Sequence, residues 1–214
     1  MKFKIKKYSK NSIQLASRSL LNGSIIILPT DTVYGLAALA ENKKAVEKIF
    51  KIKKRPKSLP LIIFVKSVKD AAKIAKFSPL DIVLAKELWP GPLTLILEKK
   101  KNKIYNGDKR LSKIGIRIPK NKTVLSLLKK VRKPLATTSA NLHTEKNTRK
   151  INNLNILENE NIEVAILANE KMSFKESTLL ETSKKEVKII RSGQINKKII
   201  RKVIRSHGYS NKIK

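Results

Sequence analysis

The sequence predicts a single α/β domain, and three observations lead to this fold class. The chain has 214 residues, of which 41% are hydrophobic, enough to bury the core of one large domain. Short apolar runs, typical of buried strands, alternate with amphipathic helical segments along its whole length. No internal repeat divides the chain. Together these features indicate one sheet covered by helices.

The chain begins with a basic arm, residues 1–11, before the first predicted element. An amphipathic helix follows over Ser12–Asn22, and the glycine after it is a usual helix stop. The apolar run Ile25–Leu28 predicts a buried strand. Apolar residues at helical spacing predict a helix over Asn42–Lys54, and Leu61–Val65 is the next strand.

Sequence patterns then predict the N-termini of two further helices. Ser67 and Ser78 each stand three residues before a carboxylate, Asp70 and Asp81, which is the pattern of a capped helix N-terminus. Pro79 fits the first turn of the second helix, where its missing N–H has no cost.

The second half of the chain contains mainly strands. Apolar runs predict them at Leu93–Leu97, Ile114–Ile118, Leu135–Thr138, Val164–Leu167, Thr178–Glu181 and Val187–Arg191. Helices are predicted over Thr123–Val131 and Ile195–Ile204, and the residues after the last helix are expected to fray. The polar, Asn-rich segment 142–161 is expected to be a loop or lid, because so long a loop inside a domain usually has a function.

Composition excludes several classes of protein. Without cysteine there is neither a disulfide framework nor a thiolate metal site. No apolar run reaches the roughly 18 residues of a membrane span, and the basic N-terminus lacks the apolar region of a signal peptide. We therefore expect a soluble cytoplasmic protein without a membrane partner.

The net charge of +33 has two explanations, and the sequence leaves both open. Clustered cations bind polyanions such as RNA by releasing counterions. Alternatively, a chain so rich in Lys, Ile and Asn reflects an A/T-rich coding bias. Charge alone indicates affinity for RNA, nucleotides or acidic partners in general.

Common catalytic and cofactor motifs are absent. No Gly-x-x-x-x-Gly-Lys-Ser/Thr or Gly-x-Gly-x-x-Gly phosphate loop occurs. His143 and His207 are the only histidines and are far apart, so we expect no metal held by side chains. A Ser-His-Asp triad would have to use His143, and no Gly-x-Ser-x-Gly elbow supports one.

Polar clusters stand instead at the predicted strand ends, where ligands gather in α/β sheets. They are Pro29–Tyr34, Lys53–Pro56, Trp89–Pro92, Arg117, Thr138–Asn141, Ser177–Thr178 and Arg191–Gly193. Hydroxyls and amides there can orient a small polar molecule, and Lys and Arg bind phosphate. Each cluster taken singly also fits a strand-ending turn, a helix end, a core aromatic residue or a helix cap.

Taken together, the clusters resemble one family. The chain is similar to the shorter, single-domain YrdC-like threonylcarbamoyl-adenylate synthases in LPTDTVYGL, KIKKRPKSLPLIIF, WPGPLTLIL, IGIRIP, LATTSAN, EST and IIRSGQI. These stretches occur in the family's order. The resemblance implies a YrdC-like catalytic domain over 12–195, with a twisted mixed β-sheet flanked by helices and a substrate cleft at the strand ends. Residues 196–214 are then a basic C-terminal helix and tail.

The resemblance also implies an activity, that of a nucleotidyltransferase. Such enzymes condense L-threonine, bicarbonate and ATP to threonylcarbamoyl-AMP and pyrophosphate. A separate transferase complex then moves the threonylcarbamoyl group to the adenosine next to a tRNA anticodon. The expected partners are therefore the three substrates, tRNA and that transferase complex. Because the segment from Lys197 follows the last matching stretch, we expect it to be dispensable for the chemical step.

By resemblance, five residues would form the threonine site. Thr32 would help to seat the substrate, and Thr30 and Tyr34 would shape the same strand-end pocket. Arg117 resembles the partner of the threonine carboxylate, and Ser177 resembles another contact to that amino acid.

The ATP site would lie beside it. Lys53, Arg55, Ser139 and Asn141 match the family's Lys-x-Arg and Ser-x-Asn pairs and are implied to be catalytic. The implied ATP-binding residues are these four together with Thr138 and Arg191. Fixed cations and hydrogen-bond donors are what attack on an α-phosphate requires. Magnesium is expected to accompany ATP, held mainly by phosphate and water.

Two positions depart from the family pattern. Leu59 stands where members commonly have an Asn that contacts ATP, and Phe64 stands where some have a His near the threonine. The details of these two contacts must therefore differ here. The alternative to an enzyme is a non-catalytic YrdC-like module that binds tRNA or double-stranded RNA. A carbamoyl-transferring maturation factor contains a related domain, but would require zinc-finger cysteines and further domains.

Overall fold

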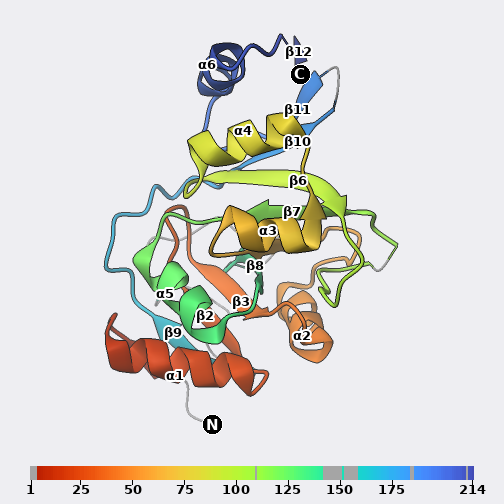
Figure 1. Cartoon of the computed structure of the whole chain (residues 1–214). Helices are drawn as coiled ribbons and strands as arrows, with labels where there is room; N and C mark the ends of the chain where they lie inside the picture. Colours follow the sequence, from red (N-terminus) through yellow and green to blue (C-terminus); the bar gives the residue numbers. More distant parts are fainter. Residues whose placement is uncertain (1–3, 109, 142–150, 152–158, 184–185, 211) are drawn as a thin grey trace.

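The computed structural model describes residues 4–108, 110–141, 151, 159–183, 186–210 and 212–214 (Figure 1). The helices are α1 (Lys10–Leu21), α2 (Lys43–Lys53), α3 (Val68–Ile74), α4 (Pro79–Leu88), α5 (Lys122–Val131) and α6 (Lys197–Ser206). The strands are β1 (Lys4–Lys6), β2 (Ile25–Leu28), β3 (Gly35–Leu39), β4 (Ile62–Phe64), β5 (Ala75–Lys76), β6 (Leu93–Lys99), β7 (Lys113–Arg117), β8 (Leu135–Ser139), β9 (Ile162–Ile166), β10 (Thr178–Thr182), β11 (Glu186–Arg191) and β12 (Lys212–Ile213).

Within this part of the chain the strands form one mixed sheet in the order β1-β9-β2-β3-β8-β4-β7-β6-β10-β11-β12, and β5 pairs with β6. β2, for example, pairs parallel with β9 and antiparallel with β3. Helices lie along the sheet in Figure 1, with α1 beside α5 at one end and α4 beside α6 at the other. The predicted α/β domain, a twisted mixed sheet flanked by helices, is confirmed.

Strand β2 shows why the first apolar run contains no polar residue. Ile26 and Leu28 belong to a core cluster with side chains of α1 and α5. Ile25 and Ile27 belong to the larger cluster that includes side chains of α2. Because successive side chains of a strand point to opposite faces, both faces of β2 are buried, and an unbroken aliphatic run results.

The helix-start signals are confirmed. The Ser67 hydroxyl accepts a hydrogen bond from the Asp70 amide at 3.1 Å and begins α3. Ser78 and Asp81 form a reciprocal capping box at α4, with Pro79 in the first turn. The first helix starts earlier than predicted, because Ser9 caps it and Ser12 completes a capping box from inside the helix.

Strand β3 was not predicted. Its sequence, Gly-Leu-Ala-Ala-Leu, has no β-branched residue and therefore little intrinsic strand preference. It is extended because it lies antiparallel between β2 and β8, with all five residues buried. Tertiary pairing overrides local propensity here.

Both ends of the described chain join the sheet, contrary to the expectation of a bare arm and a fraying tail. β1 lies inside the basic arm and pairs parallel with β9. β12 pairs parallel with β11, and Ile213 is buried. Ile200 and Ile204 of α6 are buried in the main core cluster. This packing argues against the expectation that the segment from Lys197 can be removed freely.

Most of the predicted loop 142–161 lies outside the described residues. Among the helices that the structure describes, none is long and apolar enough to cross a bilayer.

Candidate active site

The turn between β2 and β3 is organised by one buried hydroxyl. Thr30 Oγ1 accepts hydrogen bonds from the amides of Thr32 and Val33, both at 3.0 Å, and lies 2.7 Å from the Val33 carbonyl oxygen. The Thr30 side chain therefore satisfies main-chain groups of the turn that lie outside the pairing of β2 with β3. Thr32 and Asp31 of this turn reach Arg117 at the end of β7, although β8 and β4 separate β3 from β7 in the sheet order.

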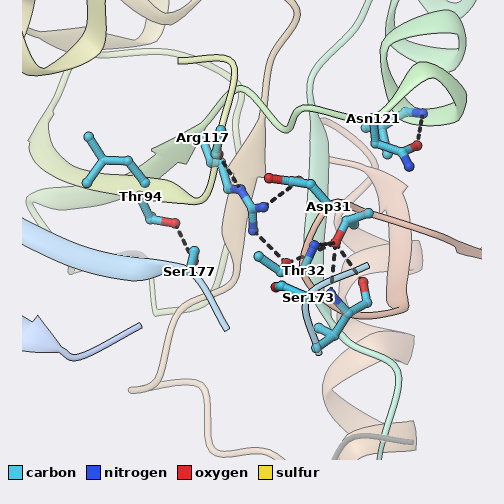
Figure 2. A network of polar contacts seen from close by, with 12 residues as sticks. Asp31, Thr32, Thr94, Arg117, Asn121, Ser173 and Ser177 are labelled. Carbon is cyan, nitrogen blue, oxygen red and sulfur yellow. Dashed lines mark hydrogen bonds and ion pairs between the residues drawn. The ribbon is translucent and has the colours of Figure 1, made fainter. Parts of the chain in front are cut away.

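Arg117, at the end of β7, is the central cation of this region (Figure 2). Its side chain is only 3% exposed. Its guanidinium donates to the Gly91 carbonyl at 3.0 Å, to Thr32 Oγ1 at 3.0 Å and to Asp31 Oδ1 at 2.5 Å. Burial lowers the pKa of Arg117, and the Asp31 carboxylate acts in the opposite direction. The other Asp31 oxygen, Oδ2, is buried without a hydrogen-bond partner among the described residues.

Phe64 supplies a further contact to Arg117. The Arg117 guanidinium carbon lies 5.6 Å from the centroid of the Phe64 ring, within cation–π range. An aromatic face therefore supports the buried cation from β4, the strand that pairs with β7.

A second arginine, Arg191, is the last residue of β11 and bonds to Ser177, the residue before β10. Arg191 donates to the Ser177 carbonyl from Nε at 3.2 Å and from a terminal nitrogen at 3.0 Å. The same nitrogen donates to Ser177 Oγ at 3.1 Å, and Thr94 Oγ1 lies 2.8 Å from that hydroxyl. Its remaining nitrogen lies 2.9 Å from a carboxylate oxygen of Glu176.

A third arginine, Arg55, follows α2. Lys54 ends that helix in the left-handed conformation, and the Arg55 amide donates to the Phe50 carbonyl at 3.0 Å. Arg55 Nε donates to the Leu59 carbonyl at 2.8 Å. The main chain of Leu59 therefore holds the Arg55 side chain. Burial lowers the pKa of Arg55, Arg191 lowers it further, and Glu176 opposes both.

Lys53 and Asn141 form a separate buried pair. Lys53 Nζ donates to Asn141 Oδ1 at 3.0 Å and to the Asn141 main-chain carbonyl. The Ala140 amide donates to the Tyr34 carbonyl at 2.8 Å, and the Tyr34 hydroxyl accepts from the Ala168 amide at 3.0 Å. These contacts join the end of β8 to the β2–β3 turn and to α2.

One cavity collects most of the predicted site residues. Its lining residues are Thr30, Thr32, Val33, Tyr34, Gly35, Arg55, Pro60, Ile62, Phe64, Arg117, Thr137, Thr138, Ser139, Glu176, Ser177 and Arg191. Every residue predicted to bind threonine is among them, and so are Arg55, Thr138, Ser139 and Arg191 from the predicted ATP site. Lys53 and Asn141 are not among the lining residues and bond to each other beside them.

Sequence reasoning assigned no role to two carboxylates that the structure places here. Asp31 pairs with Arg117, and Glu176 pairs with Arg191. Both stand inside stretches that had been singled out, LPTDTVYGL and EST. Their adjacency to predicted ligand residues was the available signal, but which arginine each would pair with depends on the sheet order.

Comparisons with known proteins identify the family. The model of the Sua5/YciO/YrdC family, described as "Telomere recombination", matches residues 18–193. The chain belongs to this family. A Methanocaldococcus jannaschii member is 33% identical over 190 residues, which cover 87% of either protein. Escherichia coli YciO shares the fold, with a TM-score of 0.81 at 20% identity over 93% of this chain and 98% of YciO.

Two relatives carry the name threonylcarbamoyl-AMP synthase. The Pyrococcus abyssi protein is 38% identical over 133 residues, covering 61% of this chain and 38% of the relative. The Bacillus subtilis protein is 36% identical over 138 residues, covering 63% and 40%. The chain thus spans less than half the length of these two relatives. A structure of P. abyssi Sua5 complexed with L-threonine matches all of this chain and 63% of Sua5, with a TM-score of 0.86 at 30% identity.

Proposed function

We propose that this YrdC-like protein is a threonylcarbamoyl-AMP synthase, a nucleotidyltransferase that condenses L-threonine, bicarbonate and ATP and releases pyrophosphate. The observation that carries the proposal is the single cavity, which joins a buried arginine beside threonine hydroxyls to two further arginines. Relatives of this name and the threonine complex of P. abyssi Sua5 support it.

In this proposal the Arg117 end of the cavity binds threonine. A guanidinium has five N–H donors, and the contacts with Gly91, Thr32 and Asp31 use three of them. The other two N–H groups can donate hydrogen bonds to the carboxylate of the amino acid. Thr30 and Tyr34 shape the pocket by holding the turn and the end of β8, and Ser177 bounds it from β10.

The Arg55–Arg191 end binds ATP, with Thr138 and Ser139 contributing hydroxyls from the end of β8. Lys53 and Asn141 act together at its edge, because the lysine holds the Asn141 amide and main chain in place. The threonine amine and bicarbonate condense to N-carboxythreonine with loss of water. A carbamate oxygen of this compound attacks the α-phosphorus, and the bond from that phosphorus to the bridging β-phosphate oxygen breaks as pyrophosphate leaves. Fixed guanidiniums stabilise the charge that develops on the leaving group.

The cavity does not fit a magnesium ion held by the protein. Its two neighbouring carboxylates, Asp31 and Glu176, pair with arginines, and the described residues contain no cluster of three or more metal-ligating side chains. We propose that magnesium arrives with ATP, bound by phosphate and water, and we assign it no step.

The partners follow from the reaction. We propose that the product passes to a transferase complex acting on tRNA in the cytoplasm, and that the basic residues of α6 attract tRNA. Residues 12–195 would then form the catalytic domain, flanked by the arm 1–11 and the segment 196–214, each of which adds a strand to the sheet.

The deciding experiment supplies the purified full chain with ATP, magnesium, labelled bicarbonate and one amino acid at a time. Pyrophosphate release that depends on threonine, together with label in an AMP-linked product, is the expected result. RNA binding without pyrophosphate release for any amino acid would overturn the proposal in favour of a non-catalytic RNA-binding module.

A further inference from the structure

Glu176 places a negative charge in the part of the cavity assigned above to phosphate. Its side chain lines the same cavity as Arg55 and Arg191. A carboxylate there repels an incoming phosphate group. The reaction as derived gives Glu176 no task, so its position requires another explanation.

Arg191 is held in a fixed orientation by groups other than Glu176. Its Nε and one terminal nitrogen donate to Ser177, at 3.2 Å and 3.0 Å from the carbonyl oxygen. Glu176 meets only the remaining terminal nitrogen, at 2.9 Å. Removing the carboxylate therefore leaves the guanidinium oriented and frees this terminal nitrogen to bind another anion.

The charge of the Glu176 carboxylate also acts on Arg55. Its pKa is lowered first by burial and then by Arg191, whereas Glu176 raises it. The two guanidiniums repel each other, and Glu176 is the acid that offsets their repulsion. The charges of Arg55, Arg191 and Glu176 therefore influence one another within the cavity.

The Glu176 main chain is held by contacts that its side chain does not share. The Gln194 amide donates to the Glu176 carbonyl at 3.0 Å, and Gly193 packs directly against the main chain of 176–178. The side chain is 36% exposed, and Arg191 is its one ion-pair partner among the described residues. Rotation about the side-chain bonds can therefore withdraw the carboxylate without moving the strand.

We propose that Glu176 is the internal counter-ion of the phosphate subsite, which pairs with Arg191 until the polyphosphate of the substrate displaces it. This inference rests on the proposed function. A polyphosphate carries enough charge to replace the carboxylate, whereas a singly charged anion does not. When pyrophosphate leaves, the carboxylate returns to Arg191, so Glu176 weakens the retention of this product.

The test measures binding of inorganic pyrophosphate to the full chain by calorimetry, without magnesium or amino acid. Glu176→Gln should bind it about tenfold more tightly than the wild type, since pyrophosphate then no longer has to displace a carboxylate from Arg191. The matched control is Glu98→Gln, which removes an acid paired with Lys76 at 2.6 Å outside the cavity. It changes the net charge equally and should leave pyrophosphate affinity unchanged.

Two further measurements separate this role from mere support of Arg191. In an Arg191→Met background, Glu176→Gln should give little or no gain, because the gain acts through that guanidinium. In the turnover assay, Glu176→Gln should be inhibited by pyrophosphate at about tenfold lower concentration, whereas Glu98→Gln should behave as wild type.

Unchanged or weaker pyrophosphate binding by Glu176→Gln, while the wild type binds pyrophosphate and turns over threonine, overturns the counter-ion and leaves the proposed function intact. An equal gain in Glu98→Gln also overturns it, because net charge then explains the effect. Should Glu176→Gln not fold, Glu176→Ala gives the same comparison. Absence of pyrophosphate binding in every variant overturns the counter-ion, whereas the proposed function is overturned only if threonine-dependent pyrophosphate release is absent as well.

Discussion

At the scale of single residues, the cavity is defined by three arginines that have different surroundings. Arg117 is buried with a carboxylate and an aromatic ring. Arg191 is oriented by Ser177, and Arg55 by one main-chain carbonyl. A buried cation with several protein partners contributes to both stability and binding, whereas a partly exposed one contributes mainly to binding. Substitutions at these positions should therefore separate the two effects.

Replacing Arg55 by lysine tests the phosphate assignment. Lysine keeps the charge but loses the planar two-point contact, so threonine-dependent pyrophosphate release should fall roughly 30- to 1,000-fold, equivalent to about 2–4 kcal/mol. The thermal unfolding midpoint should hardly move. Lys51→Arg, an exposed change on α2, is the control and should keep full activity. Wild-type rates for Arg55→Lys would mean that phosphate binds elsewhere.

Replacing Asp31 by asparagine tests the buried pair. The amide retains an acceptor for Arg117 but removes the opposing charge, so the free energy of unfolding in urea should drop by about 1.5–3 kcal/mol. Glu41→Gln breaks a more exposed pair, with Lys133 at 2.8 Å, and should cost less than about 1 kcal/mol. Equal losses in the two variants would contradict the special role given to burial.

At the scale of elements, the cavity depends on strand ends held close by small residues and short hydrogen bonds. The Thr30 hydroxyl fixes the turn between β2 and β3. The Thr178 hydroxyl, which lies 2.7 Å from the Ile195 carbonyl oxygen, joins the start of β10 to the chain after β11. Gly193 allows these two segments to touch. A side chain at this contact should therefore disturb Ser177 and Glu176 together.

Replacing Gly193 by alanine tests that contact. A Cβ atom there would lie 2.3 Å from the Ser177 carbonyl carbon and the Thr178 nitrogen, so the backbone must shift. We expect the free energy of unfolding to fall by about 1–3 kcal/mol, as at overpacked sites. We also expect the variant to lose most of its activity. In Gly115→Ala the new atom meets Thr94 at 3.4 Å, an ordinary contact, and stability should be retained. A stable, active Gly193→Ala protein would show that the two segments can separate without harm.

At the scale of the whole molecule, the excess positive charge is greatest on a helix that does not line the cavity. Helix α6 has five basic residues among its ten and no acid, and its apolar residues Ile200 and Ile204 are buried. Its exposed face is therefore a cationic surface on a fixed part of the fold. It suits the phosphate backbone of RNA better than scattered lysines do, because its charges have fixed spacing.

Neutralising this face distinguishes an RNA surface from coding bias. Replacing Lys198, Arg201 and Arg205 with glutamine should weaken tRNA binding and reduce the slope of log affinity against log salt by about 2–3. Pyrophosphate release should stay near wild type, since none of the three lines the cavity. Replacing Lys44, Lys48 and Lys51 on α2 removes equal charge and is the control. The same fall in slope for both triple variants would favour coding bias over a dedicated surface.

The sequence by itself determined the fold class, most of the helices and strands, and part of the set of residues that line the cavity. Those features depend on local properties: aliphatic runs, serine caps and polar residues at strand ends. Both faces of β2 could be inferred as buried because its four residues are all aliphatic. Which end of the sheet each site residue would reach was not a local property: Arg117, at the end of β7, lies level with the start of β8 and not with its end.

Only the tertiary structure decided which charged side chains form ion pairs and which segments of low strand preference become strands. Asp31 meets Arg117 and Glu176 meets Arg191 only because β7, β10 and β11 take their places in the sheet order. β3, β1 and β12 have weak local preference and become extended through hydrogen bonds to neighbours distant in sequence. Charge pairing and strand addition depend on contacts between remote segments, so no local pattern encodes them.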